Sequence, residues 1–302
     1  MKSSLEAPDK QVVEETSAKP QKPASASVID TSKMSKGKRE ALELAEASRD
    51  PLDERGSFAS NLFIGRYDFD RIYPWPEQSA EDRAAGQQFL GDLEKYLREK
   101  IDADEIDRTG EIPQNNIDDL FAMGAFGVKI PKQYEGLGLS QVNYGRAAML
   151  LGSWDENLTA LVSAHQSIGV PQPLLLFGTD EQKKKYLPRV ARREISAFAL
   201  TEWNAGSDPA NMSLRADPTE DGSAFILNGE KLWCTNLIKA GVLVVMAKTA
   251  PKIVNGKERK QITAFIVDVD SPGLEITYRC RFMGLRALYN GIVKFTNVRV
   301  PR

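Results

Sequence analysis

Two short stretches contain residues that could bind a ligand with an aromatic ring and a negative charge. The first, FALTEWNAGSD, runs from Phe198 to Asp208 and passes from apolar residues into a loop of small and polar ones. The second is Trp233-Cys234-Thr235, at the end of another apolar stretch. Together they offer an indole face, two hydroxyls and a loop whose backbone N–H groups could meet an anion, as a flavin nucleotide requires. The residues alone favour an ordinary strand and turn, because Trp and Thr are common in strands and Gly-Ser-Asp is common in turns.

Other chemistries have little support. The chain has one histidine, His165, and two distant cysteines, Cys234 and Cys280, which fit no zinc or disulfide pattern and favour a reducing compartment. We therefore expect a cytoplasmic protein, with the mitochondrial matrix as the alternative. His165 shares a helical face with apolar neighbours, so it is expected in the core. A net charge of −2 gives no reason to expect a nucleic-acid partner, and no nucleotide-binding glycine motif follows a strand.

The spacing of apolar residues is helical from residue 58 to about residue 194. The apolar face of one predicted helix consists of Phe89, Leu93, Tyr96, Leu97 and Ile101. The stretches VNYGRAAMLLG and DENLTALVSAHQSIG predict two more helices. Thr179 and Gln182 predict a capping box at the start of another.

Short apolar runs separated by turn residues replace this spacing after Ile195. AFILNGEKLWCTN is typical of a hairpin with Asn228-Gly229 as its turn. GVLVVMAKT, ITAFIVDV, LEITYR and IVKFTNVRV follow at strand length, with Asn255-Gly256 and Pro272-Gly273 as turns. A helical part followed by strands predicts the α+β class, with an antiparallel, barrel-like sheet.

The first residues differ from the rest. Residues 1–56 contain no aromatic side chain and are rich in Lys, Glu, Ser, Ala and Pro, so we expect a disordered tail. Its acidic residues argue against a transit peptide. The expected organisation is a tail over 1–56, a helical domain over 57–195 and a β domain over 196–302.

Three ordered motifs, FALTEWNAGSD, LNGEKLWCTN and MGLRALYNGIVKFTNVRVP, resemble the acyl-CoA dehydrogenase family. GSFASNLFIGRYDFDRIYPWP, AHQSIG and LLFGTDEQKKKYLP resemble its very-long-chain branch. The resemblance extends from about Phe58 to the end of the chain. It implies a helical N-terminal domain, a middle β domain, a C-terminal helical bundle and FAD between them. The implied reaction removes one α and one β hydrogen from a fatty acyl-CoA and yields a trans-2-enoyl-CoA.

The resemblance also implies roles for individual residues. The cofactor-binding residues would be Phe198, Ala199, Leu200, Thr201, Gly206, Ser207, Trp233, Cys234 and Thr235. Thr201 would bond the flavin ring, Gly206 would allow close backbone approach, and Ser207 would also meet the acyl-CoA. Trp233 would pack on the isoalloxazine, and Thr235 would reach the nitrogen that accepts hydride. The chain departs from the family at Trp203, where proline is frequent, and at Cys234, where an aliphatic residue is frequent.

The family's C-terminal bundle, which supplies the glutamate base, is absent from these residues. We therefore assign no catalytic residue and no metal ligand, and we expect this piece alone to be inactive. The implied partners are a fatty acyl-CoA, an acceptor like electron-transfer flavoprotein, and a second copy of the full-length chain. Two alternatives stay open: a non-catalytic assembly protein with the same fold, or another flavoenzyme such as an acyl-CoA oxidase.

Overall fold

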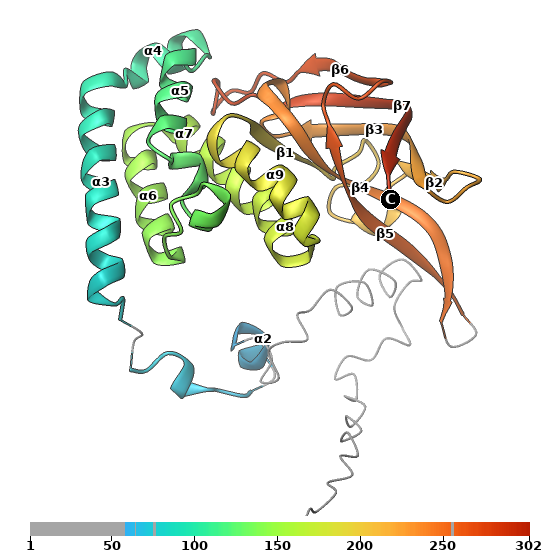
Figure 1. Cartoon of the computed structure of the whole chain (residues 1–302), viewed down its shortest axis with the longest axis horizontal. Coiled ribbons are helices and arrows are strands. Elements are labelled where there is room, and N and C mark those ends of the chain that lie inside the picture. Colours follow the sequence, from blue (N-terminus) through green and yellow to red (C-terminus); the bar gives the residue numbers. More distant parts are fainter. Residues whose placement is uncertain (1–57, 64, 75–76, 255–256) are drawn as a thin grey trace, which may run out of the picture.

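The computed structural model describes residues 58–63, 65–74, 77–254 and 257–302. A helical region and a curled β-sheet pack side by side (Figure 1). This arrangement confirms the expected α+β class. The predicted disordered tail over 1–56 and the predicted Asn255-Gly256 turn lie outside the described residues. No helix in the described ranges is long and apolar enough to cross a bilayer.

The helices of the first region each bury one face. They are α2 (Phe58–Phe63), α3 (Ala80–Lys100), α4 (Ala103–Thr109), α5 (Gln114–Ala122), α6 (Gln141–Trp154), α7 (Glu156–Ser163), α8 (Pro171–Phe177) and α9 (Asp180–Arg192). As the spacing predicts, α3 buries Phe89, Leu93 and Leu97. Thr179 and Gln182 form the predicted capping box at the start of α9. α4 and α8 are short helices that the apolar spacing did not predict.

The helix predicted over residues 155–169 changes its geometry in its second half. α7 ends at Ser163, and the chain continues as a π-helical segment over Ala164–Ile168. His165 in this segment is fully buried, and its Nδ1 atom accepts a hydrogen bond from the Ser196 N–H at 2.9 Å. Burial lowers the pKa of His165 to about 3, so the imidazole is neutral at physiological pH. The prediction of a core histidine is confirmed.

The second region is a single curled sheet. Its strands are β1 (Ile195–Ala199), β2 (Arg215–Pro218), β3 (Ala224–Cys234), β4 (Ala240–Val254), β5 (Lys257–Asp268), β6 (Leu274–Arg279) and β7 (Gly291–Pro301). Their order is β1-β4-β2-β3-β7-β6, with β5 paired to β4. The last four predicted strands are therefore present. Most neighbours are antiparallel, as expected, but β1 and β2 run parallel to β4, so the sheet is mixed.

The predicted Asn228-Gly229 hairpin turn is wrong, because β3 runs through both residues without reversing. Its two halves pair with one neighbour, β7, and the register shifts between Leu227 and Gly229. Gly229 has a φ of 142°, and a Cβ atom there would lie 2.9 Å from the Leu214 Cα atom. Glycine is needed here for a strand irregularity and a close backbone approach instead of a turn.

A tyrosine from the end of the chain joins the two regions. Tyr289 is 1% exposed, and its hydroxyl donates to the Ile112 carbonyl at 3.0 Å and accepts from the Ile112 N–H at 3.1 Å. Burial raises the pKa of Tyr289 to about 12, so the hydroxyl keeps its proton. Arg279 reinforces this junction by donating to the Gly110 carbonyl at 2.7 Å.

A buried ion pair holds the chain that follows β1. The Lys231 side chain is 0% exposed, and its Nζ atom donates to a Glu202 carboxylate oxygen at 2.8 Å and to the Leu200 carbonyl at 2.9 Å. The Glu202 carboxylate also accepts from the backbone N–H groups of Ser213 and Leu214. One carboxylate therefore joins the end of β1, the start of β2 and the middle of β3.

Two opposing effects set the pKa of Glu202. Burial alone would raise it, but the hydrogen bonds from Lys231, Leu214 and Ser213 and the nearby ammonium outweigh burial and lower it. Burial lowers the pKa of Lys231, and the carboxylate opposes that shift. The pair is ionised at neutral pH, because each charge is compensated by the other and by hydrogen bonds.

We predict opposite effects for alanine at two glycines. Gly229→Ala should lower the free energy of unfolding by roughly 1–3 kcal/mol, because the left-handed backbone and the close Leu214 backbone both oppose a Cβ atom. Gly91→Ala is the matched control, since its position in α3 has open space around it. It should raise stability by up to about 1 kcal/mol. Urea denaturation measures both, and an undiminished stability of Gly229→Ala would contradict the strand geometry.

We predict that Glu202→Gln destabilises the fold by about 3–5 kcal/mol, because it leaves the Lys231 ammonium buried without a counter-charge. The double variant Glu202→Gln/Lys231→Met should recover much of this loss. The exposed control Glu220→Gln should leave stability unchanged.

The same pair predicts a pH dependence. A depressed folded-state pKa contributes stability above the ordinary value of 4.5, and that contribution is lost as the pH falls through the folded value. Unfolding midpoints measured across the acid range should therefore fall for the wild type and change less for Glu202→Gln. Equal acid sensitivity of the two proteins would show that Glu202 does not contribute to the pH dependence of stability.

Candidate functional site

The two stretches singled out in the sequence lie against each other. The Leu232 N–H donates to the Thr201 carbonyl at 2.8 Å, so the chain leaving β1 runs beside the end of β3. Lys231 adds its bond to the Leu200 carbonyl one residue earlier. The loop after Thr201 and the segment Trp233–Thr235 therefore begin from one fixed point.

The first stretch makes a tight turn and then exposes its backbone. Glu202 and Ala205 exchange backbone hydrogen bonds at 3.0 and 3.2 Å. Gly206 and Ser207 follow on the surface. A Cβ atom at Gly206 would have open space around it, with the Thr201 Cγ2 atom the nearest at 4.0 Å. Glycine here leaves backbone accessible from outside, as close approach of a ligand requires.

The loop ends at an aspartate with a free oxygen. One carboxylate oxygen of Asp208 accepts from the Asn211 side chain at 2.5 Å. The other, Oδ1, is buried and has no hydrogen-bond partner among the described residues. A buried acceptor without a donor marks a place where a ligand or solvent group would complete the hydrogen bonding.

The second stretch presents an indole at the end of β3. Trp233 is 57% exposed and has a φ of 55°. Thr235 is half-buried, and its hydroxyl oxygen accepts a hydrogen bond from the Asn290 side chain at 3.2 Å. Asn236 then directs the chain inward, where its side-chain amide donates to the Leu161 carbonyl at 2.9 Å. A large apolar ring face and a hydroxyl thus lie two residues apart.

The other predicted residues occupy supporting positions. Phe198 is half-buried and packs against the core formed by α8, α9 and β4, and Ala199 is fully buried. Leu200 and Thr201 are half-buried and offer their carbonyls to Lys231 and Leu232. Their backbones shape the site, and Thr201 has a hydroxyl that could meet a ligand.

Cys234 is a core residue. It is 1% exposed, and burial raises the pKa of its thiol to about 12. The reactive form of cysteine is the thiolate, so this thiol is unreactive at physiological pH. Burial leaves only the backbone of Cys234 available to a ligand.

Trp203, one of the two departures from the family pattern, lies in the tight turn beside the exposed loop. Its ring is 66% exposed, and its indole N–H donates to the Glu230 carboxylate on β3. The bulkier residue thus adds a further link between the loop and β3.

Sequence reasoning missed three polar residues that organise the site: Glu202, Lys231 and Asn290. Lys231 had a weak signal, because it directly precedes Leu232-Trp233-Cys234 in a predicted strand, and a lysine buried there needs a charged partner. Glu202 and Asn290 had none, since their partners are distant in sequence.

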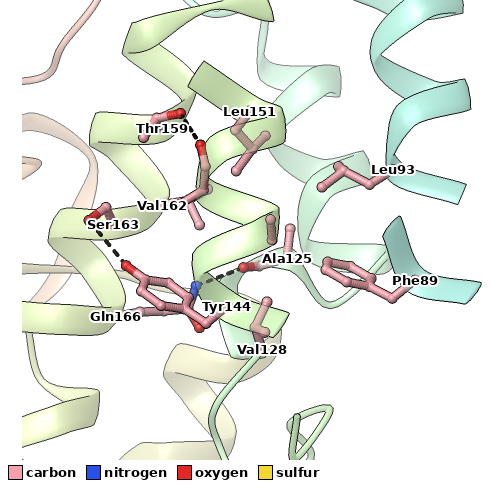
Figure 2. Close-up of a pocket in the computed structure, with 12 residues that line it drawn as sticks. Phe89, Leu93, Ala125, Val128, Tyr144, Leu151, Thr159, Val162, Ser163 and Gln166 are labelled. Carbon is pink, nitrogen blue, oxygen red and sulfur yellow. Dashed lines mark hydrogen bonds between the residues drawn. The ribbon is translucent and has the colours of Figure 1, made fainter. Parts of the chain in front are cut away.

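The enclosed hollow in Figure 2 is not a second candidate. It lies within the helical region, where residues such as Phe89, Leu93, Tyr144 and Leu151 surround it. It has no room for a water-sized sphere. A separate open cleft of about 440 Å³ lies near Arg192, Arg193 and Lys239. Neither contains a residue predicted to bind the flavin.

These features fit a flat aromatic ring with an anionic group attached. The exposed Trp233 face suits the ring, and each of the two stretches carries a threonine hydroxyl, Thr201 in one and Thr235 in the other. The accessible backbone at Gly206 and Ser207 suits an anion. The described residues contain no cluster of ligands suited to a metal ion.

Comparisons with known proteins identify the family of the chain. The family description "Acyl-CoA dehydrogenase, N-terminal domain" matches residues 84–194, and "Acyl-CoA dehydrogenase, middle domain" matches residues 197–298. A probable acyl-CoA dehydrogenase, FadE10 of Mycobacterium tuberculosis, is 46% identical over 87% of this chain and 40% of its own length. The mouse mitochondrial very long-chain specific acyl-CoA dehydrogenase is 35% identical over 82% of this chain and 38% of its own.

A solved structure extends the likeness to three dimensions. The acyl-CoA dehydrogenase of Bacillus anthracis, complexed with FAD, has a TM-score of 0.61 and 28% identity, over 78% of this chain and 39% of that one. The chain thus spans about 40% of the length of the curated relatives that it matches. The two matched descriptions follow each other in order and cover most of the chain, which therefore belongs to the acyl-CoA dehydrogenase family of FAD-dependent oxidoreductases.

Proposed function

We propose that the protein binds FAD and dehydrogenates a fatty acyl-CoA to the trans-2-enoyl-CoA. The observation that carries this proposal is the contact between the Thr201 carbonyl and the Leu232 N–H, which joins the exposed loop to the exposed Trp233 in a member of this family. Dehydrogenation removes a proton from the α carbon and a hydride from the β carbon, and a carbon–carbon double bond forms between them. FAD supplies the acceptor for the hydride when it is bound.

The residues of this chain would hold and orient the cofactor. Trp233 offers its indole face to the ring, and the hydroxyls of Thr201 and Thr235 offer hydrogen bonds to the ring edge. The backbone of Gly206 and the Ser207 side chain lie in the loop suited to the pyrophosphate, with Ser207 also available to the acyl-CoA. These roles follow from the resemblance to the family, and the exposure of Trp233, Gly206 and Ser207 is compatible with them.

Removal of the α proton requires a base, because a proton beside a thioester is only weakly acidic. Glu202 is close to the site, but it is paired with Lys231, and its pKa lies below the ordinary value. A carboxylate held in that way is a poor proton acceptor. We propose that the base belongs to residues outside these 302.

We further propose that the substrate has a long acyl chain and that the electrons pass to an acceptor like electron-transfer flavoprotein. The sequence motifs of the very-long-chain branch support the first point, and the similarity to the mouse very long-chain enzyme supports it further. The proposed assembly of the full-length protein is a homodimer. The two buried free cysteines are compatible with a reducing compartment, so we propose the cytoplasm, with the mitochondrial matrix as the alternative.

We predict that the full-length protein, given palmitoyl-CoA, reduces an artificial electron acceptor and forms the 2-enoyl thioester. Residues 1–302 alone should bind FAD weakly and show no turnover. Turnover by residues 1–302 at the full-length rate would place the base within these residues. An acyl-CoA oxidase would instead produce hydrogen peroxide from oxygen without the acceptor, and an assembly protein would do neither.

We predict that two substitutions in the full-length protein change how it binds FAD. Trp233→Ala should weaken FAD retention and shift the flavin absorption spectrum, because the exposed ring face is lost. Thr235→Val is nearly isosteric, so it should fold normally and lose one hydrogen bond, worth about 0.5–1.5 kcal/mol. The exposed residue Tyr278 on β6 provides a control, Tyr278→Ala, that should retain flavin normally. Unchanged spectra and full flavin occupancy in both site variants would contradict the assignment.

A further inference from the structure

The chain leaves β3 through two backbone conformations that residues other than glycine rarely adopt. Trp233 has a φ of 55°, and Asn236 has a φ of 69°. The Trp233 side chain is 57% exposed, so burial of its ring does little to hold the first of these conformations. Left-handed residues persist only where their surroundings restrain them. Another group must restrain Trp233.

Asn290 is one such group. It is 4% exposed, and its side-chain amide donates to the Trp233 carbonyl at 3.2 Å and to the Thr235 hydroxyl oxygen at 3.2 Å. Its own backbone is fixed on both sides, because its carbonyl accepts from the Cys280 N–H and its N–H donates to the Leu288 carbonyl, each at 2.9 Å. One side chain therefore ties Trp233 and Thr235 to the strand pair β6–β7.

The chemistry of these contacts fixes which way each group points. The Trp233 carbonyl can only accept a hydrogen bond, so the NH₂ group of Asn290 must face it. The second hydrogen of that NH₂ group then goes to the Thr235 oxygen. The Thr235 hydroxyl thus accepts from Asn290, and its own proton is left to donate elsewhere. In the described part of the chain, the Thr235 hydroxyl makes this hydrogen bond as an acceptor and donates to no other group.

The Asn290 amide lowers the stability of the fold. Its Oδ1 atom is buried and has no hydrogen-bond donor in the parts of the chain that the structure describes. An unpartnered buried amide oxygen destabilises a fold, and an apolar residue of similar shape would avoid that loss. What the amide provides, and an apolar residue cannot, is the pair of donors to Trp233 and Thr235.

We propose that Asn290 is a positioning residue of the flavin site. Its amide fixes Thr235 as a hydrogen-bond donor toward the flavin nitrogen that receives hydride, and it holds Trp233 in the conformation that exposes the indole. This inference rests on the proposed FAD site and adds a residue to it. Asn290 acts through Thr235 and Trp233.

The direction of the effect follows from the chemistry of the ring. The oxidised ring nitrogen has a lone pair that accepts a hydrogen bond, and the reduced nitrogen carries a hydrogen in that place. A hydroxyl fixed as a donor therefore favours oxidised flavin, and its loss should favour reduction. Removing the amide should shift the equilibrium between oxidised and reduced flavin toward the reduced form by roughly 2–10-fold, the range expected for one hydrogen bond. This shift corresponds to a rise of about 10–30 mV in the two-electron midpoint potential.

The experiment is a double-mutant cycle on the full-length protein purified with its flavin. Asn290→Leu keeps the approximate shape and removes both donors, Thr235→Val removes the hydroxyl, and the third variant combines them. The midpoint potential and the FAD dissociation constant are measured for each protein, and thermal unfolding checks the fold. Asn290→Ala, which also loses the NH₂ group and adds no charge, provides the same test if Asn290→Leu does not fold. Asn115→Leu, at an exposed position in α5, is the matched control.

We expect the effects of the Asn290 and Thr235 substitutions on the flavin to be non-additive. Asn290→Leu alone should raise the midpoint potential and weaken FAD binding roughly 2–10-fold, and it should have less than half of that effect when Thr235 is already valine. Additive effects of the two changes, or an unchanged potential in Asn290→Leu, would overturn the role of Asn290. If Thr235→Val itself leaves the flavin unchanged, the flavin assignment of Thr235 fails, and the inference fails with it.

Discussion

The buried Glu202–Lys231 pair is the interaction on which the arrangement of the site depends. Two charges inside a protein are tolerated only when each finds its counter-charge and enough hydrogen bonds. Here the carboxylate accepts from two backbone N–H groups, and the ammonium donates to a backbone carbonyl, so meeting these needs also fixes the backbone. The loop between β1 and β2 is free to expose its glycine because its two ends are held in this way.

The same principle operates on the other side of the site. Asn290 joins the end of β3 to β7 through hydrogen bonds to Trp233 and Thr235, and Tyr289 beside it joins the sheet to the helical region through Ile112. Neighbouring residues of one short segment thus connect the candidate site with the core between the two regions. The exposed groups that would touch a ligand are few, and buried polar groups determine where they lie.

Local patterns in the sequence predicted much of the fold. The apolar spacing of α3, the capping box of α9 and the strand Leu274–Arg279 depend on residues close in sequence, and each agrees with the structure. The Asn228-Gly229 turn failed because contacts with Leu214 and β7 override the local turn preference. The roles of Glu202, Lys231 and Asn290 could not be predicted, because long-range pairing decides whether a polar side chain lies inside or outside. The motifs placed Thr201 and Trp233 in one site, and only the structure revealed the Thr201–Leu232 hydrogen bond that joins the two stretches.

The parallel pairing of β1 with β4 has a consequence for how the protein folds. β1 cannot complete its hydrogen bonds until β4, which comes after β2 and β3 in the chain, has been made and has reached the sheet. Pairing between segments so far apart forms slowly, since a long loop must close before any contact compensates for the lost entropy. Glu202 follows β1 directly and needs partners on β3 and at the start of β2. We therefore expect the loop after β1 to take its final shape only after β3 and β4 have joined the sheet.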